Sequence, residues 1–123
     1  PLISQYSPKI EILRIRSLSS ATAPQLLQLV QRCPHLHTID IANTIEYSDE
    51  FITQLAISCS YLQSLTFVSL NDITITDTSL LTLSTHCLQL QELEIYKCFE
   101  ITESAIVQFI RDCKHLHTLV LCE

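Results

Sequence analysis

A cysteine-centred pattern recurs along this chain and constrains its fold more than any other feature. It is marked by Cys33, Cys59, Cys87 and Cys113, which are separated by steps of 26, 28 and 26 residues. One further step towards the N-terminus reaches Ser7, and the same apolar spacing follows it. A fixed period of this length is the sequence signature of stacked repeats. We therefore expect a row of similar units rather than one closed core.

The first half of each unit predicts a short strand. Two apolar residues stand two positions apart, so they share one face of an extended segment. The five pairs are Leu13 and Ile15, Ile39 and Ile41, Leu65 and Phe67, Leu93 and Ile95, and Leu119 and Leu121. The residues between and beside these pairs are predicted to point to the opposite face.

The second half of each unit predicts a helix. Counting back from each cysteine, positions 7, 4, 3 and 0 are mostly apolar, which draws one stripe down a helix. A hydroxyl residue stands eleven positions before each cysteine, where it can cap a helix N-terminus. These residues are Thr22, Ser48, Thr76 and Thr102, and the acids Asp49, Asp77 and Glu103 follow three of them. We predict helices of about 10–12 residues beginning near residues 23, 49, 77 and 103.

A strand and a helix in one unit cannot bury their apolar faces alone, but stacked neighbours can. Strands pack about 4.8 Å apart and helices about 8–10 Å apart, so the stack must bend or stagger, with its strands on the inner, concave side. The predicted fold class is a curved α/β solenoid of about four and a half repeats, with five parallel strands on the concave side and four helices on the convex side. The two additional residues of the 28-residue step are placed around residues 69–72.

Composition excludes several classes of function. The net charge of −6 argues against a nucleic-acid binder, and no apolar run of about 18 residues could span a membrane. The chain contains no glycine, which excludes a phosphate-binding glycine loop. The turns are therefore expected either to avoid positive φ or to use Asn43 and Asn71 for it. Because four of six cysteines hold one repeat position, we expect reduced, buried thiols and a cytoplasmic or nuclear protein.

The unit over residues 87–112 resembles the cysteine-containing leucine-rich repeats of F-box leucine-rich repeat proteins and of a related antagonist of mitotic exit. The resemblance rests on the repeated apolar residues, on Cys98 and on the element Ile101-Thr102-Glu103. It covers nearly the whole chain, although the place of Cys98 is taken in the other units by Leu18, Thr44 and Leu70.

This resemblance implies a leucine-rich repeat domain over residues 1–123. We expect it to be a fragment of a longer solenoid, and no F-box is recognisable in it. The implied function is protein binding, as the substrate-recognition repeats of an F-box-type ubiquitin ligase receptor. A Skp-type adaptor would be a partner only if an F-box lies upstream. The alternatives are a regulatory adaptor or inhibitor without ligase function, and a structural segment that self-assembles.

The concave face is the expected binding surface, because neighbouring strands align their outward residues there. The candidate protein-binding residues are Arg14, Arg16, Asp40, Thr66, Glu92, Glu94 and Tyr96. Arg14 and Asp40 are predicted to be cross-strand neighbours that neutralise each other. Glu92, Glu94 and Tyr96 form the candidate patch for a partner carrying Lys or Arg, and the alternative is a solvated acidic face.

No metal, cofactor or catalytic site is expected. The pairs His35 and His37, and His115 and His117, occupy equivalent positions three repeats apart, about 14 Å at the strand spacing, which is too far to share one ion. Cys87 follows His86 directly, but adjacent helical residues point about 100° apart, so they do not predict a catalytic pair. We therefore predict that the chain is not an enzyme.

Overall fold

The computed structural model describes residues 9–16, 23–42, 48–68 and 75–122, in which strands and helices alternate. In chain order the elements are β1 (Ile12–Arg16), α2 (Ala23–Gln31), β2 (Thr38–Ala42), α3 (Asp49–Ser58), β3 (Ser64–Val68), α4 (Asp77–His86), β4 (Glu92–Tyr96), α5 (Glu103–Asp112) and β5 (Thr118–Cys122). The predicted helix starts at residues 23, 49, 77 and 103 are confirmed. The expectations for Ser7, Thr22, Asn43, Asn71 and residues 69–72, and for Leu18, Thr44 and Leu70, lie outside the described residues.

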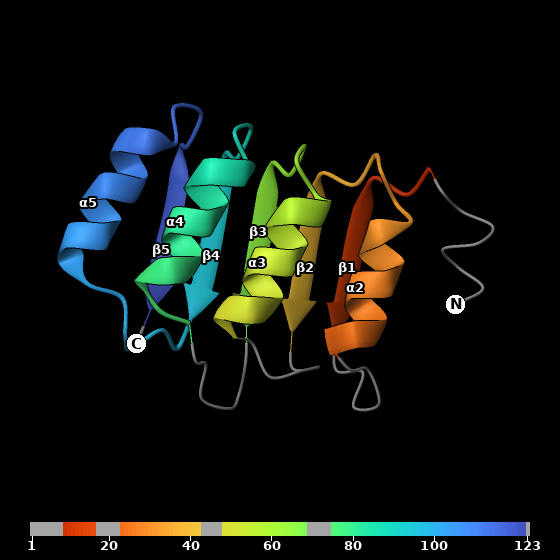
Figure 1. Cartoon of the computed structure of the whole chain (residues 1–123), viewed down its shortest axis with the longest axis horizontal. Coiled ribbons are helices and arrows are strands. Elements are labelled where there is room, and N and C mark those ends of the chain that lie inside the picture. Colours follow the sequence, from red (N-terminus) through yellow and green to blue (C-terminus); the bar gives the residue numbers. More distant parts are fainter. Residues whose placement is uncertain (1–8, 17–22, 43–47, 69–74, 123) are drawn as a thin grey trace.

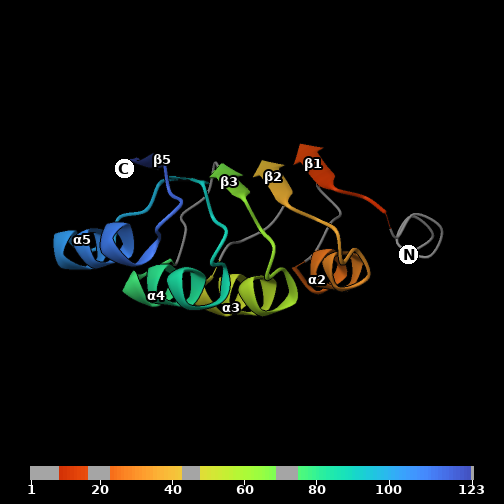
Figure 2. The same cartoon turned by 90° about the horizontal axis from the view of Figure 1, so that it is seen from above.

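The elements form two layers. All five strands belong to one parallel sheet with the order β1-β2-β3-β4-β5, so each strand pairs with the next one in the chain. All four helices lie on one face of this sheet, each following the strand of its own unit (Figures 1 and 2). The other face of the sheet carries no described helix. This α/β arrangement is compatible with the expected leucine-rich repeat solenoid.

The core lies between the two layers and is built from the predicted apolar positions. The paired strand residues of β2, β3 and β4 are fully buried, as are Ile52 and Leu55 of α3 and Leu83 of α4. Phe51 and Phe67 meet edge to face with their ring centroids 6.0 Å apart. One stripe position differs from the pattern, because Ile110 of α5 is 53% exposed. No described helix packs against the far side of α5, which explains that exposure.

The predicted hydroxyl caps are confirmed for the three helices whose caps are described. Ser48 Oγ accepts from the Phe51 amide at 3.2 Å, and Thr102 Oγ1 accepts from the Ala105 amide at 3.2 Å. Thr76 Oγ1 accepts from the Thr78 amide at 3.3 Å. These bonds satisfy amides that have no partner within their own helix.

Two of these cap residues, Thr76 and Thr102, also join consecutive units, which the sequence pattern did not predict. The Thr76 amide and hydroxyl donate to the two carboxylate oxygens of Asp49, at 2.9 and 2.6 Å, and Ser79 Oγ donates to Asp49 at 2.5 Å. In the next unit the Thr102 amide and hydroxyl donate to Asp77, both at 2.7 Å. We call this arrangement the carboxylate clamp. It ties the first turn of one helix to the cap of the next.

None of the six cysteines, all of which lie in the described residues, forms a disulfide, and the four repeat cysteines are buried, as predicted. Removal from water raises the pKa of Cys59 and Cys87 to about 12 and that of Cys113 to about 11. Cys87 Sγ donates to the Cys59 carbonyl at 3.5 Å, so neighbouring units contact each other along the cysteine ladder. The thiols therefore behave as small buried hydrophobic groups.

The backbone has a positive φ among the described residues at Lys97, at 65°, directly after β4. Steric strain of the Cβ atom makes this left-handed conformation less favourable by about 1–2 kcal/mol. The strained turn lies beside Tyr96 of the candidate patch. No helix in the described parts of the chain has both the length and the hydropathy needed to cross a membrane.

Candidate functional site on the solvent face of the sheet

The helix-free face of the sheet presents aligned rows of outward side chains. The first residues of the strands form the row Ile12, Thr38, Ser64, Glu92 and Thr118. The third residues form the row Arg14, Asp40, Thr66, Glu94 and Val120. The buried positions between them repeat one chemistry, whereas these rows change chemistry from strand to strand. A uniform backbone therefore carries a variable surface.

The basic end of this surface lies on β1. Arg14 is the register partner of Asp40, as predicted, but the ion pair forms between Asp40 and Arg16. The predicted neutralisation of Asp40 by Arg14 is therefore wrong. Diagonal neighbours across a sheet lie within reach of a long side chain, and Arg16 takes that diagonal path. Because the Arg16 side chain is 62% exposed, the pair contributes only about 0–1 kcal/mol.

Asp40 is largely enclosed, with 14% of its side chain exposed. One carboxylate oxygen is held by Arg16, while Oδ1 is buried and has no hydrogen-bond partner among the described residues. Thr66, its register partner on β3, is half-buried and carries no charge. Along the row of third strand residues, the charged residues Arg14 and Asp40 are followed by the neutral hydroxyl of Thr66 and then by the acid Glu94.

The acidic end lies on β4, where the three residues of the candidate patch come together. Ser64 Oγ donates to Glu92 at 3.0 Å, and Tyr96 Oη donates to Glu94 at 3.3 Å. The charge of Glu94, followed by desolvation, raises the pKa of Tyr96, so this phenol remains a neutral donor. The hydrogen bond from Ser64 was not predicted from the sequence, and it forms because the strand register places Ser64 opposite Glu92.

No register partner of Glu92 or Glu94 is basic, because their neighbours are Ser64, Thr118, Thr66 and Val120. Lys97 follows Tyr96 in the sequence but lies beyond the strand. The two half-buried carboxylates therefore stay adjacent on one face without a cation beside them in either row. Such a surface favours a partner that supplies Lys or Arg.

The histidines take part in local contacts. His37 Nδ1 lies 3.0 Å from Thr38 Oγ1, and His117 Nδ1 lies 3.0 Å from Thr118 Oγ1, in equivalent places of two units. Within the described ranges, no three His, Cys, Asp or Glu side chains gather closely enough to hold a metal ion.

Comparison with known proteins gives a distant relationship. No protein-family model matches the chain. The chain is 25% identical over 126 residues to the Transport inhibitor response 1-like protein of Oryza sativa subsp. japonica, across 99% of this chain. It spans 22% of the length of that rice protein. The likeness supports, at most, a relationship to leucine-rich repeat proteins.

Proposed function

We propose that this chain is a section of a leucine-rich repeat solenoid that binds another protein through the solvent face of its sheet. The observation that carries the proposal is the contrast between repeated buried residues and changing outward ones on five aligned strands. In stacked repeat proteins the sheet or groove side supplies the extended binding surface. The proposed role is recognition, without catalysis, cofactor or metal.

The finer proposal is that the chain belongs to the substrate-recognition repeats of an F-box-type ubiquitin ligase receptor. Its support is the resemblance of the unit at residues 87–112 to that repeat class, together with the distant likeness to a part of a much longer protein. The role implies an F-box elsewhere in the same protein and a Skp-type adaptor bound to it. It also implies the cytoplasm or nucleus, where free thiols persist.

The proposed contact patch is Glu92, Glu94 and Tyr96, and the proposed partner presents a basic segment. Partners are to be captured with the protein from its own cells and identified by mass spectrometry. The double variant Glu92→Lys, Glu94→Lys should reduce capture of the partner by about tenfold or more, because like charges then face each other. Glu50→Lys, on the exposed surface of α3, is the matched control and should leave capture unchanged.

The same capture separates the ligase proposal from the adaptor alternative. Recovery of a Skp-type adaptor and a cullin supports the ligase receptor, whereas one stoichiometric regulatory protein without them supports an adaptor or inhibitor. Equal partner recovery by the wild type and the double variant would remove the patch from the proposal. If the Glu50→Lys control also fails to capture the partners, the loss of capture in the double variant would be due to the change in net charge and not to the patch.

A second candidate function, self-assembly, is favoured by the exposure of β5. Leu119 and Leu121 are half-exposed, whereas the equivalent Leu93 and Ile95 of β4 are fully buried. An added strand would cover them and pair the edge of β5. Sedimentation over a hundredfold concentration range tests this, since self-assembly predicts a rising mass that Leu121→Lys abolishes. A constant monomer mass removes this candidate.

A further inference from the structure

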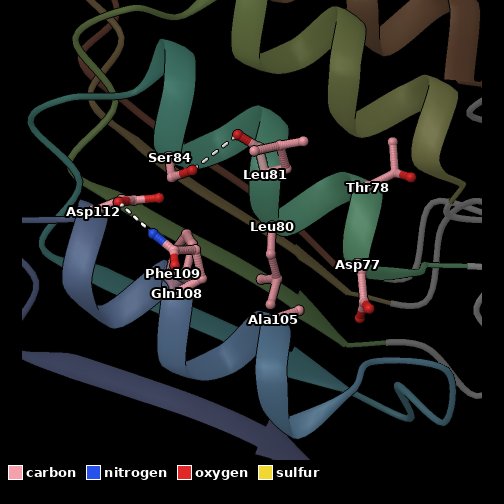
Figure 3. Close-up of a pocket in the computed structure, with 9 residues that line it drawn as sticks. All are labelled: Asp77, Thr78, Leu80, Leu81, Ser84, Ala105, Gln108, Phe109 and Asp112. Carbon is pink, nitrogen blue, oxygen red and sulfur yellow. Dashed lines mark hydrogen bonds between the residues drawn. The ribbon is translucent and has the colours of Figure 1, made fainter.

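The helix layer carries a groove that the proposed function does not use. It lies between α4 and α5 and has a volume of about 240 Å³ (Figure 3). Its floor is apolar, because it is formed by Leu80 and Phe109, which are nearly fully buried. Leu81 lines the groove from α4 while leaving 63% of its own surface exposed. An apolar side chain entering here would cover a leucine that water now contacts.

Small residues keep the groove open. Ser84 of α4 and Ala105 of α5 both line it, and neither reaches across to the other helix. Ser84 Oγ donates to the Leu81 carbonyl at 2.9 Å within its own helix. The serine hydroxyl is therefore already satisfied and presents no unmet polar group to an apolar occupant.

The groove is acidic at both ends. Asp77 begins α4 and Asp112 ends α5, and Figure 3 shows them at opposite ends of the groove. Asp77 is occupied by the Thr102 clamp, whereas Asp112 accepts from Gln108 Nε2 at 2.9 Å through one oxygen. A carboxylate at a helix C-terminus is disfavoured by the helix dipole, so a cation beside Asp112 would be favourable. Arg111 precedes Asp112 and Lys114 follows it by two residues, but the groove lining contains no basic residue.

We propose that this groove binds a short segment of a second partner protein, with one apolar side chain between Leu81 and Phe109 and a Lys or Arg beside Asp112. The volume is below the roughly 300–1,000 Å³ of small-molecule sites, so it suits a side chain rather than a cofactor. The apolar floor and acidic ends match a basic, apolar segment and oppose an acidic one. Because the groove and the proposed patch lie on opposite layers, one chain could join two proteins.

The probe is a synthetic 12-residue peptide with a central leucine flanked on each side by two lysines, added to the isotope-labelled protein and followed by NMR. The amide shifts should be confined to α4 and α5. Ser84→Leu, which fills the groove, and Leu81→Ser, which removes its exposed wall, should each weaken binding by about tenfold. Replacement of the lysines by glutamates, or a rise to 0.5 M salt, should weaken it by a similar factor.

Thr85→Leu is the matched control, because this exposed residue of α4 lies outside the groove lining and should not affect binding. Thermal unfolding of each variant establishes that the stack is intact. Absence of peptide shifts, shifts on the sheet face, or unchanged binding by Ser84→Leu and Leu81→Ser would each overturn the proposal. A dimer that Ser84→Leu dissolves would assign the groove to a second copy and would also overturn it. None of these outcomes bears on the patch at Glu92 and Glu94.

Discussion

The three helix junctions of this molecule share a pattern of apolar residues but differ in their polar connection. At the α3–α4 and α4–α5 junctions, a carboxylate in the first turn accepts from the amide and hydroxyl of the next unit's cap. At the α2–α3 junction the equivalent residue is Ala23, and Ser48 has no such acceptor. Among the described residues, Ser48 therefore caps its own helix without binding the preceding one, whereas Thr76 and Thr102 also bind the preceding unit.

The comparison teaches that equal repeats are not equally coupled. In a stacked protein, stability is approximately the sum of each unit's own stability and its interface with its neighbours. An interface with two or three charge-assisted hydrogen bonds should open later than one that lacks them among its described residues. We therefore expect the first unit to separate before the central ones, and four predictions test this difference.

The largest effect is expected from Asp49→Ala. The change removes the acceptor for Thr76 and Ser79 and leaves their donors at a partly buried interface, which should cost about 1–3 kcal/mol of unfolding free energy. Urea unfolding measures the loss. Glu50→Ala, at the exposed neighbouring position, is the control and should stay within about 0.5 kcal/mol of the wild type. Equal losses in the two variants would mean that the clamp contributes nothing specific.

The second prediction concerns acid. Burial alone would raise the pKa of Asp49, but the hydrogen bonds from Ser79 and Thr76 outweigh it and lower the pKa below its ordinary value. The folded state thus holds the proton less tightly than the unfolded state. The contribution of the clamp is complete above the unfolded pKa and is lost as pH falls through the lower folded pKa.

Urea unfolding of the wild type and of Asp49→Asn, measured from pH 7 to pH 3, tests this sign. The wild type should lose more stability than Asp49→Asn over the acidic end of the range, so their difference should shrink as pH falls. A difference that stays constant, or grows, would show that the carboxylate of Asp49 is not stabilised by the fold.

The elements and the core followed from the sequence because they depend on local periodicity. Pairs of apolar residues such as Leu65 and Phe67 locate a strand, and a hydroxyl such as Thr76 locates a helix start. The clamp did not follow, because an acid after a cap already has a local explanation in the helix dipole. Its second role depends on how far consecutive helices are offset, which no spacing within one unit specifies.

The sequence predicted which strands form the candidate surface and which of their residues align across it. The register of consecutive parallel strands placed Arg14 opposite Asp40, and this alignment is present. The choice of Arg16 as the partner of Asp40 depends on the reach of a long side chain across a diagonal, which the rows do not determine. The α4–α5 groove was invisible for a similar reason, since it depends on how the side chains of two neighbouring helices meet.

The third prediction installs a clamp where it is absent. Ala23→Asp places a carboxylate at the start of α2, where it can accept from the cap of α3 and also favour the helix dipole. The expected gain is about 0.5–1 kcal/mol. A double-mutant cycle with Ser48→Ala separates the two causes, because only the clamp couples the two positions. A gain that persists unchanged without the Ser48 hydroxyl would mean that the dipole alone is responsible.

The smallest effect is expected at the same junction but on the sheet face, from Arg16→Gln. The ion pair with Asp40 should contribute about 0.5 kcal/mol in low salt and less in 0.5 M salt, because Arg16 is mostly exposed. Arg14→Gln is the matched control, since this neighbouring arginine forms no ion pair within the described residues, and it should change stability less.

The size of the Arg16→Gln effect decides how the first junction is held. A loss above about 2 kcal/mol that salt does not reduce would mean that Asp40 behaves as a buried charge that needs its partner. The first junction would then have a polar connection of its own, on the sheet instead of the helices. In that case the absence of a carboxylate clamp at Ala23 would not make this junction the weakest of the three.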